Sequence, residues 1–217
     1  PADMPLPMLR AIVEVPVVSA LGTLIQTPGY DPASRLLYQP YDATVTISIP
    51  DQPTSSDRAW ARSLIDELLA DFPFATNADR TNAIACMPLP FVRSLITGPT
   101  PLHLFEAPTP GSGKGLLAKA VLYPAVGGQV GAIADARDDD EMRKRITARL
   151  LEGRAVTLFD NITRPVDSGV ISAALTETRW DDRRLGKTET LSLPIQTIWV
   201  MTANNPSLSM EIARRTV

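Results

Sequence analysis

A lysine and two glycines between an apolar run and a helix-forming tail are the residues of this chain that best predict chemistry. They lie in LHLFEAPTPGSGKGLL, residues 102–117. An apolar strand, a glycine-rich turn and a helix N-terminus, in this order, form phosphate-binding loops, because backbone N–H groups and the positive helix end converge on an anion. We therefore expect this loop to bind phosphate. The residues expected to contact it are Pro110, Gly111, Ser112, Gly113, Lys114, Gly115 and Leu116.

The loop fits the usual pattern G-x-x-x-x-G-K-[ST] incompletely. Gly113 and Lys114 are in place, but Pro108 occupies the first glycine position and Gly115 the final hydroxyl position. That hydroxyl normally ligates Mg²⁺, so its absence predicts weaker metal binding and slow hydrolysis. In the alternative interpretation, Lys114 is a surface lysine beside a flexible turn.

Two further polar residues stand where apolar runs end. Asp160 closes the run AVTLFD, and Asn204 follows the run IQTIWVMT at residues 195–202. In an open parallel sheet ligands bind outside the carboxyl ends of the strands, so both side chains are expected near the loop. Asp160 would hold Mg²⁺ directly or through water, and Asn204 would orient the attacking water or sense the γ-phosphate. The alternatives are a capping role for Asp160 and an ordinary turn at Asn205 and Pro206.

The elements that must position these residues indicate an α/β fold. Continuously apolar strands that alternate with helices predict a parallel sheet flanked by helices, here a P-loop core over residues 99–217. Residues 1–50 combine short apolar and alternating runs with turn dipeptides, which is typical of β-strands. This pattern predicts a small β-meander with its own core. Residues 51–98 are expected to form a helical lead-in.

Periodicity and capping signals place the helices. Thr54 and Asp57 have capping-box spacing, and apolar residues recur every four positions after them, which predicts an amphipathic helix. Its expected apolar face comprises Trp60, Leu64, Leu68 and Phe72. Further helices are expected from about residue 77 to the prolines at 88 and 90, over 116–123 before Pro124, over 138–152, over 166–178 and from about residue 207. A hairpin is expected over 183–193.

Composition narrows the class of protein. The 217 residues are 44% hydrophobic and 21% charged, with a net charge of −3, which gives no general electrostatic case for nucleic-acid binding. No apolar run approaches the roughly 20 residues that span a bilayer, so we expect a soluble protein without membrane contact. The single Cys86 fits a reducing, cytoplasmic location and is expected to be a small buried hydrophobe. His103, the only histidine, is expected to be structural, either satisfied or facing solvent.

The segments PTPGSGKG, LFDN, WDDRRLG and TANNPSLSMEIARR resemble the AAA+ ATPase core of replication helicases encoded by phages, plasmids and integrated elements, related to superfamily 3 and MCM-type helicases. The resemblance covers residue 99 to the C-terminus, and TPGYDPASRLLY upstream is similar to the β segment that precedes this ATPase. It implies binding of ATP and Mg²⁺ between subunits of a ring, usually of six, that acts on DNA.

The resemblance also implies roles for basic residues. Arg214 or Arg215 would reach the γ-phosphate of the neighbouring subunit as an arginine finger. Lys187, at the hairpin tip, and Arg183 would contact the DNA backbone in the ring's channel. The alternatives are an ion pair of either arginine with Glu211 at helical spacing and an exposed turn for Lys187.

The chain departs from the family pattern beyond Gly115. Asn161 stands where many AAA+ enzymes carry a water-activating glutamate, so the general base is unassigned and Glu106 is only a candidate. The core is expected to be truncated before its fifth strand and lid, since the chain stops at residues 216–217. Three hypotheses remain open: a helicase motor, a nucleotide-switched AAA+ binding module with little hydrolysis, and an α/β protein with an accidental glycine loop.

Overall fold

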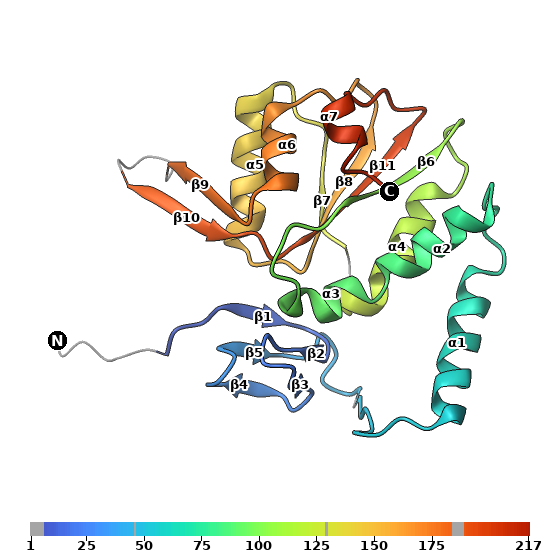
Figure 1. Cartoon of the computed structure of the whole chain (residues 1–217), viewed down its shortest axis with the longest axis vertical. Helices are drawn as coiled ribbons and strands as arrows, with labels where there is room; N and C mark the ends of the chain where they lie inside the picture. Colours follow the sequence, from blue (N-terminus) through green and yellow to red (C-terminus); the bar gives the residue numbers. More distant parts are fainter. Residues whose placement is uncertain (1–6, 46, 129, 184–188) are drawn as a thin grey trace.

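The computed structural model describes residues 7–45, 47–128, 130–183 and 189–217 (Figure 1). Its centre is a parallel sheet of four strands in the order β6-β11-β8-β7. This sheet confirms the predicted α/β fold class. The strands are β6 (Leu102–Ala107), β7 (Ala132–Ile133), β8 (Val156–Ile162) and β11 (Ile198–Asn204). Among the described residues, no helix combines the length and apolarity needed to cross a bilayer.

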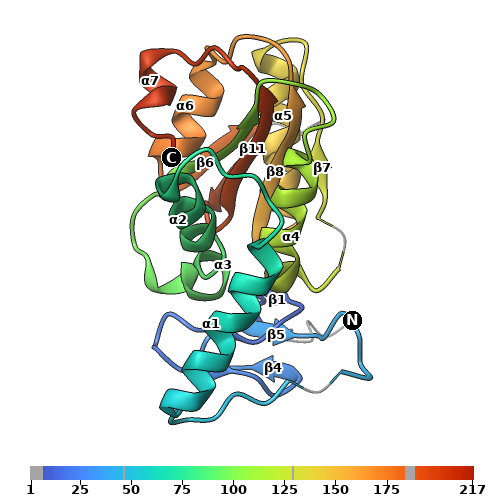
Figure 2. The same ribbon diagram turned by 90° about the vertical axis from the view of Figure 1, so that its right-hand side faces the viewer.

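Helices cover both faces of this sheet (Figures 1 and 2). One apolar cluster packs α5, α6 and α7 against one face, and a second packs α2 and α4 against the other. The bounds are α2 (Asn77–Cys86), α4 (Lys114–Val126), α5 (Asp139–Leu151), α6 (Gly169–Thr176) and α7 (Met210–Ala213). In the first cluster the rings of Phe159 and Trp199 stack with centroids 5.8 Å apart. The strands are continuously apolar because both faces are buried.

Local sequence sets most helix ends. The carboxylate of Asp138 accepts a hydrogen bond from the backbone N–H of Glu141 at 2.8 Å, and α5 ends before Gly153, whose φ of 64° suits glycine. These ends confirm the helix expected over 138–152. The expectation that Pro124 ends the preceding helix is wrong, since α4 runs through Pro124 to Val126. Burial of Leu122 and Ala125 holds the last turn despite the missing N–H of Pro124.

The lead-in begins with α1 (Ser55–Leu69), whose capping box between Thr54 and Asp57 is confirmed. Of the apolar face expected for this helix, Phe72 packs against the second core cluster, while the other three residues are exposed. Trp60, Leu64 and Leu68 are 67%, 45% and 40% exposed, and Leu69 is buried instead. The helix contacts the second core cluster through Ile65 and Leu69 in its C-terminal half.

A buried arginine joins the lead-in to the core. After α3 (Leu89–Val92), the short helix η1 (Arg93–Leu95) places Arg93 at only 4% exposure. Its guanidinium donates hydrogen bonds to the carbonyls of Ile96 and Ile195, both at 2.8 Å. Burial, together with the charge of Arg10, lowers the pKa of Arg93. These hydrogen bonds attach the segment before β6 to the segment before β11.

The N-terminal β segment has its own small core, as expected, but its topology is not a meander. The strands are β1 (Ala11–Val13), β2 (Val17–Val18), β3 (Leu24–Ile25), β4 (Gly29–Asp31) and β5 (Leu36–Tyr38). β1 pairs parallel with β5, β4 pairs antiparallel with β5, and β2 and β3 form a separate pair. The alternating run at 44–49 forms no strand at its described positions, where Val45, Ile47 and Ile49 are exposed. The side chain of Gln26 instead bonds to the backbone of Ile49.

The predicted hairpin consists of β9 (Arg179–Arg183) and β10 (Thr190–Pro194), which pair antiparallel. It begins four residues earlier than expected. Its base is anchored to α5, because the buried indole N–H of Trp180 donates to Oγ1 of Thr147 at 2.8 Å. Arg183 is exposed at the end of β9. Lys187 lies outside the described residues.

Candidate functional site

Three parallel strands end at the same edge of the sheet and bring the candidate residues together. The register pairs Asn204 with Ala107, the last residue of β6 before the glycine loop. Asp160 lies near the carboxyl end of β8, on the other side of β11. The loop, the carboxylate and the amide therefore come from β6, β8 and β11, as the strand-end argument predicts.

The loop has the backbone conformation that its glycines allow. Gly111 and Gly113 have φ values of 76° and 88°, in the left-handed region that other residues rarely adopt. Gly113 is the N-cap of α4, which starts at Lys114, and among the described residues no side chain caps this end. The N–H groups of the first helical turn are therefore available to an anion, where the helix dipole also favours negative charge.

Lys114 contacts the second predicted residue directly. Its Nζ donates a hydrogen bond to Oδ1 of Asn204 at 2.8 Å, across 90 positions of sequence. The ammonium is thereby held over the sheet edge rather than extended into solvent, which argues against the surface-lysine interpretation. A β- or γ-phosphate bound at the loop would meet both the lysine and the amide.

Asp160 is held by a residue that sequence reasoning missed. Thr202, fully buried in β11, donates from Oγ1 to Oδ1 of Asp160 at 2.6 Å. The same hydroxyl accepts the backbone N–H of Asn161 at 2.7 Å. Asn161 has a φ of 54°, and the β8–β11 register shifts at this point, so the bulge turns Asn161 away from the ladder. The available signal was the hydroxyl near the end of an otherwise apolar strand.

The donor set fits a magnesium ion that keeps most of its water. Among the described residues no three His, Cys, Asp or Glu side chains cluster as a metal site, which leaves the Asp160 carboxylate as the candidate anionic ligand. Mg²⁺ is commonly bound through one or two carboxylates together with phosphate oxygens and water. Gly115 supplies no hydroxyl, so the set is one ligand short of the usual loop.

A threonine at position 115 is expected to supply this ligand. A Cβ added to Gly115 would meet no described atom within 4 Å, so the substitution fits. We expect Gly115→Thr to raise Mg²⁺-dependent ATP turnover about tenfold, which corresponds to roughly 1.4 kcal/mol in the barrier. Turnover titrated with MgCl₂ measures the effect. Gly115→Val, with the same shape and no hydroxyl, is the control; an equal rise in both variants, or an unchanged Mg²⁺ dependence in the threonine variant, contradicts the explanation.

A cavity of about 420 Å³ adjoins the loop. Gly113 and Lys114 line one part of it, and Glu106, exposed on β6, lines it as well. Glu106 therefore stays a candidate general base. His103 also lines this cavity at 5% exposure, and Nε2 has no hydrogen-bond partner among the described residues. The expectation that His103 is satisfied or solvent-facing is thus wrong.

The two C-terminal arginines are paired within their own helix region. Arg214 and Arg215 both contact the carboxylate of Glu211, each at 2.7 Å. Partial burial raises the pKa of Glu211, but hydrogen bonds and charge from both arginines more than offset this, so the pKa lies below its usual value. The ion-pair alternative thus describes the single chain, while the finger role concerns a neighbouring subunit and stays a prediction.

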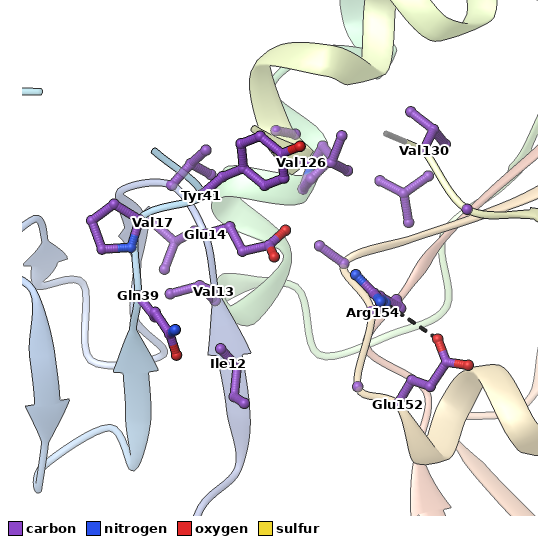
Figure 3. A pocket seen from close by; sticks show the side chains of 18 of the residues that line it. Ile12, Val13, Glu14, Val17, Gln39, Tyr41, Val126, Val130, Glu152 and Arg154 are labelled. Atoms are coloured by element: carbon purple, nitrogen blue, oxygen red, sulfur yellow. Dashed lines mark hydrogen bonds and ion pairs between the residues drawn. The ribbon is translucent and has the colours of Figure 1, made fainter. Parts of the chain in front are cut away.

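A second cavity, of about 450 Å³, lies between the N-terminal β segment and the core (Figure 3). Glu14 and Tyr41 line it from the β segment, and Val126 and Arg154 line it from the core. It adjoins the amino end of β8 at Val156, opposite to the end that carries Asp160. It is therefore separate from the phosphate loop. Cys86 is fully buried elsewhere, as expected, and burial raises its pKa to about 12.

The comparisons with known proteins give a partial structural likeness. No protein-family model and no curated protein matches the chain. JCV helicase bound to a thiazolopyridine acetamide matches with a TM-score of 0.38 and 16% identity over 74% of this chain and 50% of that one. A second structure of JCV helicase matches with a TM-score of 0.35 and 15% identity over 74% of this chain and 49% of that one. The chain spans about half the length of these helicases.

Proposed function

We propose that the chain is an ATP-binding and ATP-hydrolysing AAA+ module of a ring-forming DNA helicase or replication protein of a mobile element. One observation carries the proposal: the hydrogen bond from Lys114 to Asn204, made beside the glycine loop at the sheet edge where Asp160 also lies. An accidental glycine loop has no reason to meet a polar side chain from a neighbouring strand end.

The proposed chemistry assigns each group a task. The N–H groups of the loop and the first turn of α4 bind phosphate oxygens, and Lys114 neutralises the β- and γ-phosphates. Asp160 would hold Mg²⁺, and the ion would supply positive charge beside the transferring phosphate. Asn204 orients the attacking water or senses the γ-phosphate. Glu106 is the candidate acceptor of the water's proton.

The proposed motor needs a neighbouring subunit and DNA. Assembly with that subunit and contact with DNA are both proposed from the family resemblance. Arg214 or Arg215 would leave Glu211 and reach the γ-phosphate of a neighbouring subunit, in a ring that in the resembling family usually has six subunits. The hairpin of β9 and β10 carries Arg183, and with Lys187 beyond its described part it would contact the DNA backbone.

A second candidate function is a nucleotide-switched AAA+ module that binds ATP and assembles with partners but hydrolyses little. Two observations favour it. Gly115 has no hydroxyl that could ligate the metal. Asn161 stands in place of the usual glutamate, and its backbone N–H donates a hydrogen bond to Thr202 within the bulge. The motor and the switch differ in turnover, not in binding.

The deciding experiment measures ATP turnover by the chain with and without single-stranded DNA, beside Lys114→Ala to exclude a contaminating ATPase. Turnover that DNA stimulates and that the variant lacks supports the motor. Binding of ATP without turnover, with or without DNA, supports the switch. Failure to bind either ATP or inorganic tripolyphosphate overturns both.

A further inference from the structure

The helix α1 exposes a row of large apolar side chains, Trp60, Leu64 and Leu68, which we call the α1 stripe. These residues recur every four positions, so they lie along one side of the helix. In Figure 2, α1 lies in front of the rest of the chain. Single exposed apolar side chains are common, whereas a contiguous row of large ones marks an interaction surface.

The helix has little packing of its own. Of its 15 residues only Ile65 and Leu69 are not exposed, and both contact the second core cluster. An exposed ion pair at 2.6 Å, between Asp66 and Arg80 of α2, is a second attachment to the core. Helices of about 12–15 residues are marginal in water and gain most of their stability by packing an amphipathic face. A partner on the α1 stripe would therefore stabilise the helix.

The charges beside the α1 stripe are negative. Asp57 and Glu67 each lie three residues from a member of the stripe, which places both acids on the same side of the helix. Arg58 and Arg62 each lie two residues from Trp60, a spacing that puts them on the other side. The side chain of Glu67 has no hydrogen bond or ion pair among the described residues, so its charge is available to a partner.

This arrangement of charge decides between the possible occupants. Two α1 stripes packed on each other would bring Asp57 and Glu67 of both copies into one interface, where like charges oppose association. Helices that lie on a membrane surface carry lysine and arginine on their polar face, whereas α1 has acids beside its stripe. A helix with basic residues beside an apolar row would cover the stripe and pair with both acids.

We propose that the α1 stripe is the docking site for an amphipathic helix of another protein, one whose apolar residues are flanked by lysine or arginine. The partner's apolar side chains would pack on Trp60, Leu64 and Leu68, with Trp60 as the anchor, because tryptophan is enriched among the residues that dominate binding energy. Asp57 and Glu67 would orient the partner and select against acidic helices. This docking does not depend on nucleotide binding, and its test uses no nucleotide.

The test uses two synthetic helical peptides that lack tryptophan and tyrosine. Both carry the same row of leucines at helical spacing, flanked by lysine in one peptide and by glutamate in the other. Trp60 reports on binding, because it is 67% exposed while Trp180 and Trp199 are buried. We expect the lysine peptide to shift Trp60 emission to shorter wavelength and to protect it from acrylamide. It should bind about tenfold or more tightly than the glutamate peptide, with a difference that shrinks as salt is raised.

Three variants at exposed positions, where substitution leaves the core untouched, make the result specific to the α1 stripe. Leu64→Ala should weaken binding of the lysine peptide about tenfold. Glu67→Lys should weaken the lysine peptide and strengthen the glutamate peptide, a reversal of preference that loss of helix cannot produce. Arg62→Glu, a charge reversal on the other side of α1, is the matched control and should change each affinity by less than about threefold.

Three results would overturn the proposal. Equal affinities for the two peptides, or no binding of the lysine peptide, would show that the acids select no basic helix. Protection of Trp60 that rises with the concentration of the chain alone, together with dimers in sedimentation that Leu64→Ala abolishes, would make a second copy the occupant. A shift of Trp60 emission with vesicles of phosphatidylcholine and phosphatidylserine, but not with the peptide, would make it a membrane surface.

Discussion

Replacing Lys114 by alanine is expected to weaken ATP binding about 100-fold and to abolish measurable turnover. The ammonium would make charge-assisted hydrogen bonds to two phosphates, and each such bond contributes about 1.5–3 kcal/mol. Their loss should therefore cost at least roughly 3 kcal/mol of binding free energy, which corresponds to the 100-fold weaker affinity. The variant should remain folded, because Lys114 is only partly buried and its described partner, the amide of Asn204, can turn to water.

Titration of the variant with ATP measures the loss, and Lys119→Ala is the matched control. Lys119 is an exposed lysine of the same helix, so its substitution removes the same charge without touching the loop. We expect its affinity for ATP to stay within about threefold of the unaltered chain, the scale of a screened surface charge. Equal weakening by both substitutions would mean that net charge, not the loop, binds the nucleotide.

The role of Asn204 in ATP binding can be tested by the same titration with ATP. Since its Oδ1 accepts from Lys114, the amide both orients the lysine and lies beside the expected γ-phosphate. Asn204→Ala leaves the lysine in place but unoriented, so ATP affinity should fall less than in the Lys114 variant. A loss as large as that of Lys114→Ala would show that Lys114 binds the phosphates only when the amide orients it.

The candidate site was largely predictable because its residues stand at strand ends. Apolar runs can be read as parallel strands, and parallel strands put their carboxyl ends on one edge, so Lys114, Asp160 and Asn204 had to approach one another. Thr202 could not be assigned this role from its hydroxyl alone. A threonine within a strand is common, and only the register shift between β8 and β11 turns its hydroxyl toward Asp160.

The wrong predictions outside the site have a common cause. A hydrophobic pattern predicts the type of an element, but it does not identify the element that packs against it or pairs with it. The four-residue repeat on α1 correctly gave a helix, yet Trp60 and Leu64 are exposed because periodicity says which residues share a face, not what covers it. The N-terminal strands are two or three residues long, and the parallel pairing of β1 with β5 depends on contacts across more than twenty positions. Local sequence carries no signal for such a pairing.

The last residues of the chain pair with the outer edge of β6. The family resemblance places the start of a fifth core strand at residues 216–217. The backbone of Val217 exchanges hydrogen bonds with Leu102 and Leu104, and Thr216 bridges to Leu102 in the parallel sense. These residues lie along the outer edge of β6, beside the cavity that Val217 lines. A strand at this edge would close one side of the proposed nucleotide site.

Substituting Asp160 by asparagine is expected to separate binding of ATP from its hydrolysis. The amide oxygen can still accept the hydrogen bond from Thr202, so the local structure should persist, but the negative charge that would hold Mg²⁺ is lost. We expect turnover to fall by about 100-fold or more, which is roughly 2.7 kcal/mol in the barrier. Binding of ATP without Mg²⁺ should stay within about threefold, because loop N–H groups and Lys114 do not depend on the carboxylate.

Two companion variants make this result specific to the carboxylate. Asp140→Asn removes the same charge from the exposed face of α5 and should leave turnover unchanged. Thr202→Val keeps the charge of Asp160 but removes the hydroxyl that orients it and that accepts the N–H of Asn161, so its turnover should lie between those of the other two. If Asp160→Asn hydrolyses ATP at the unaltered rate with the same Mg²⁺ dependence, Asp160 is no metal ligand, and its contact with Thr202 serves only the bulge.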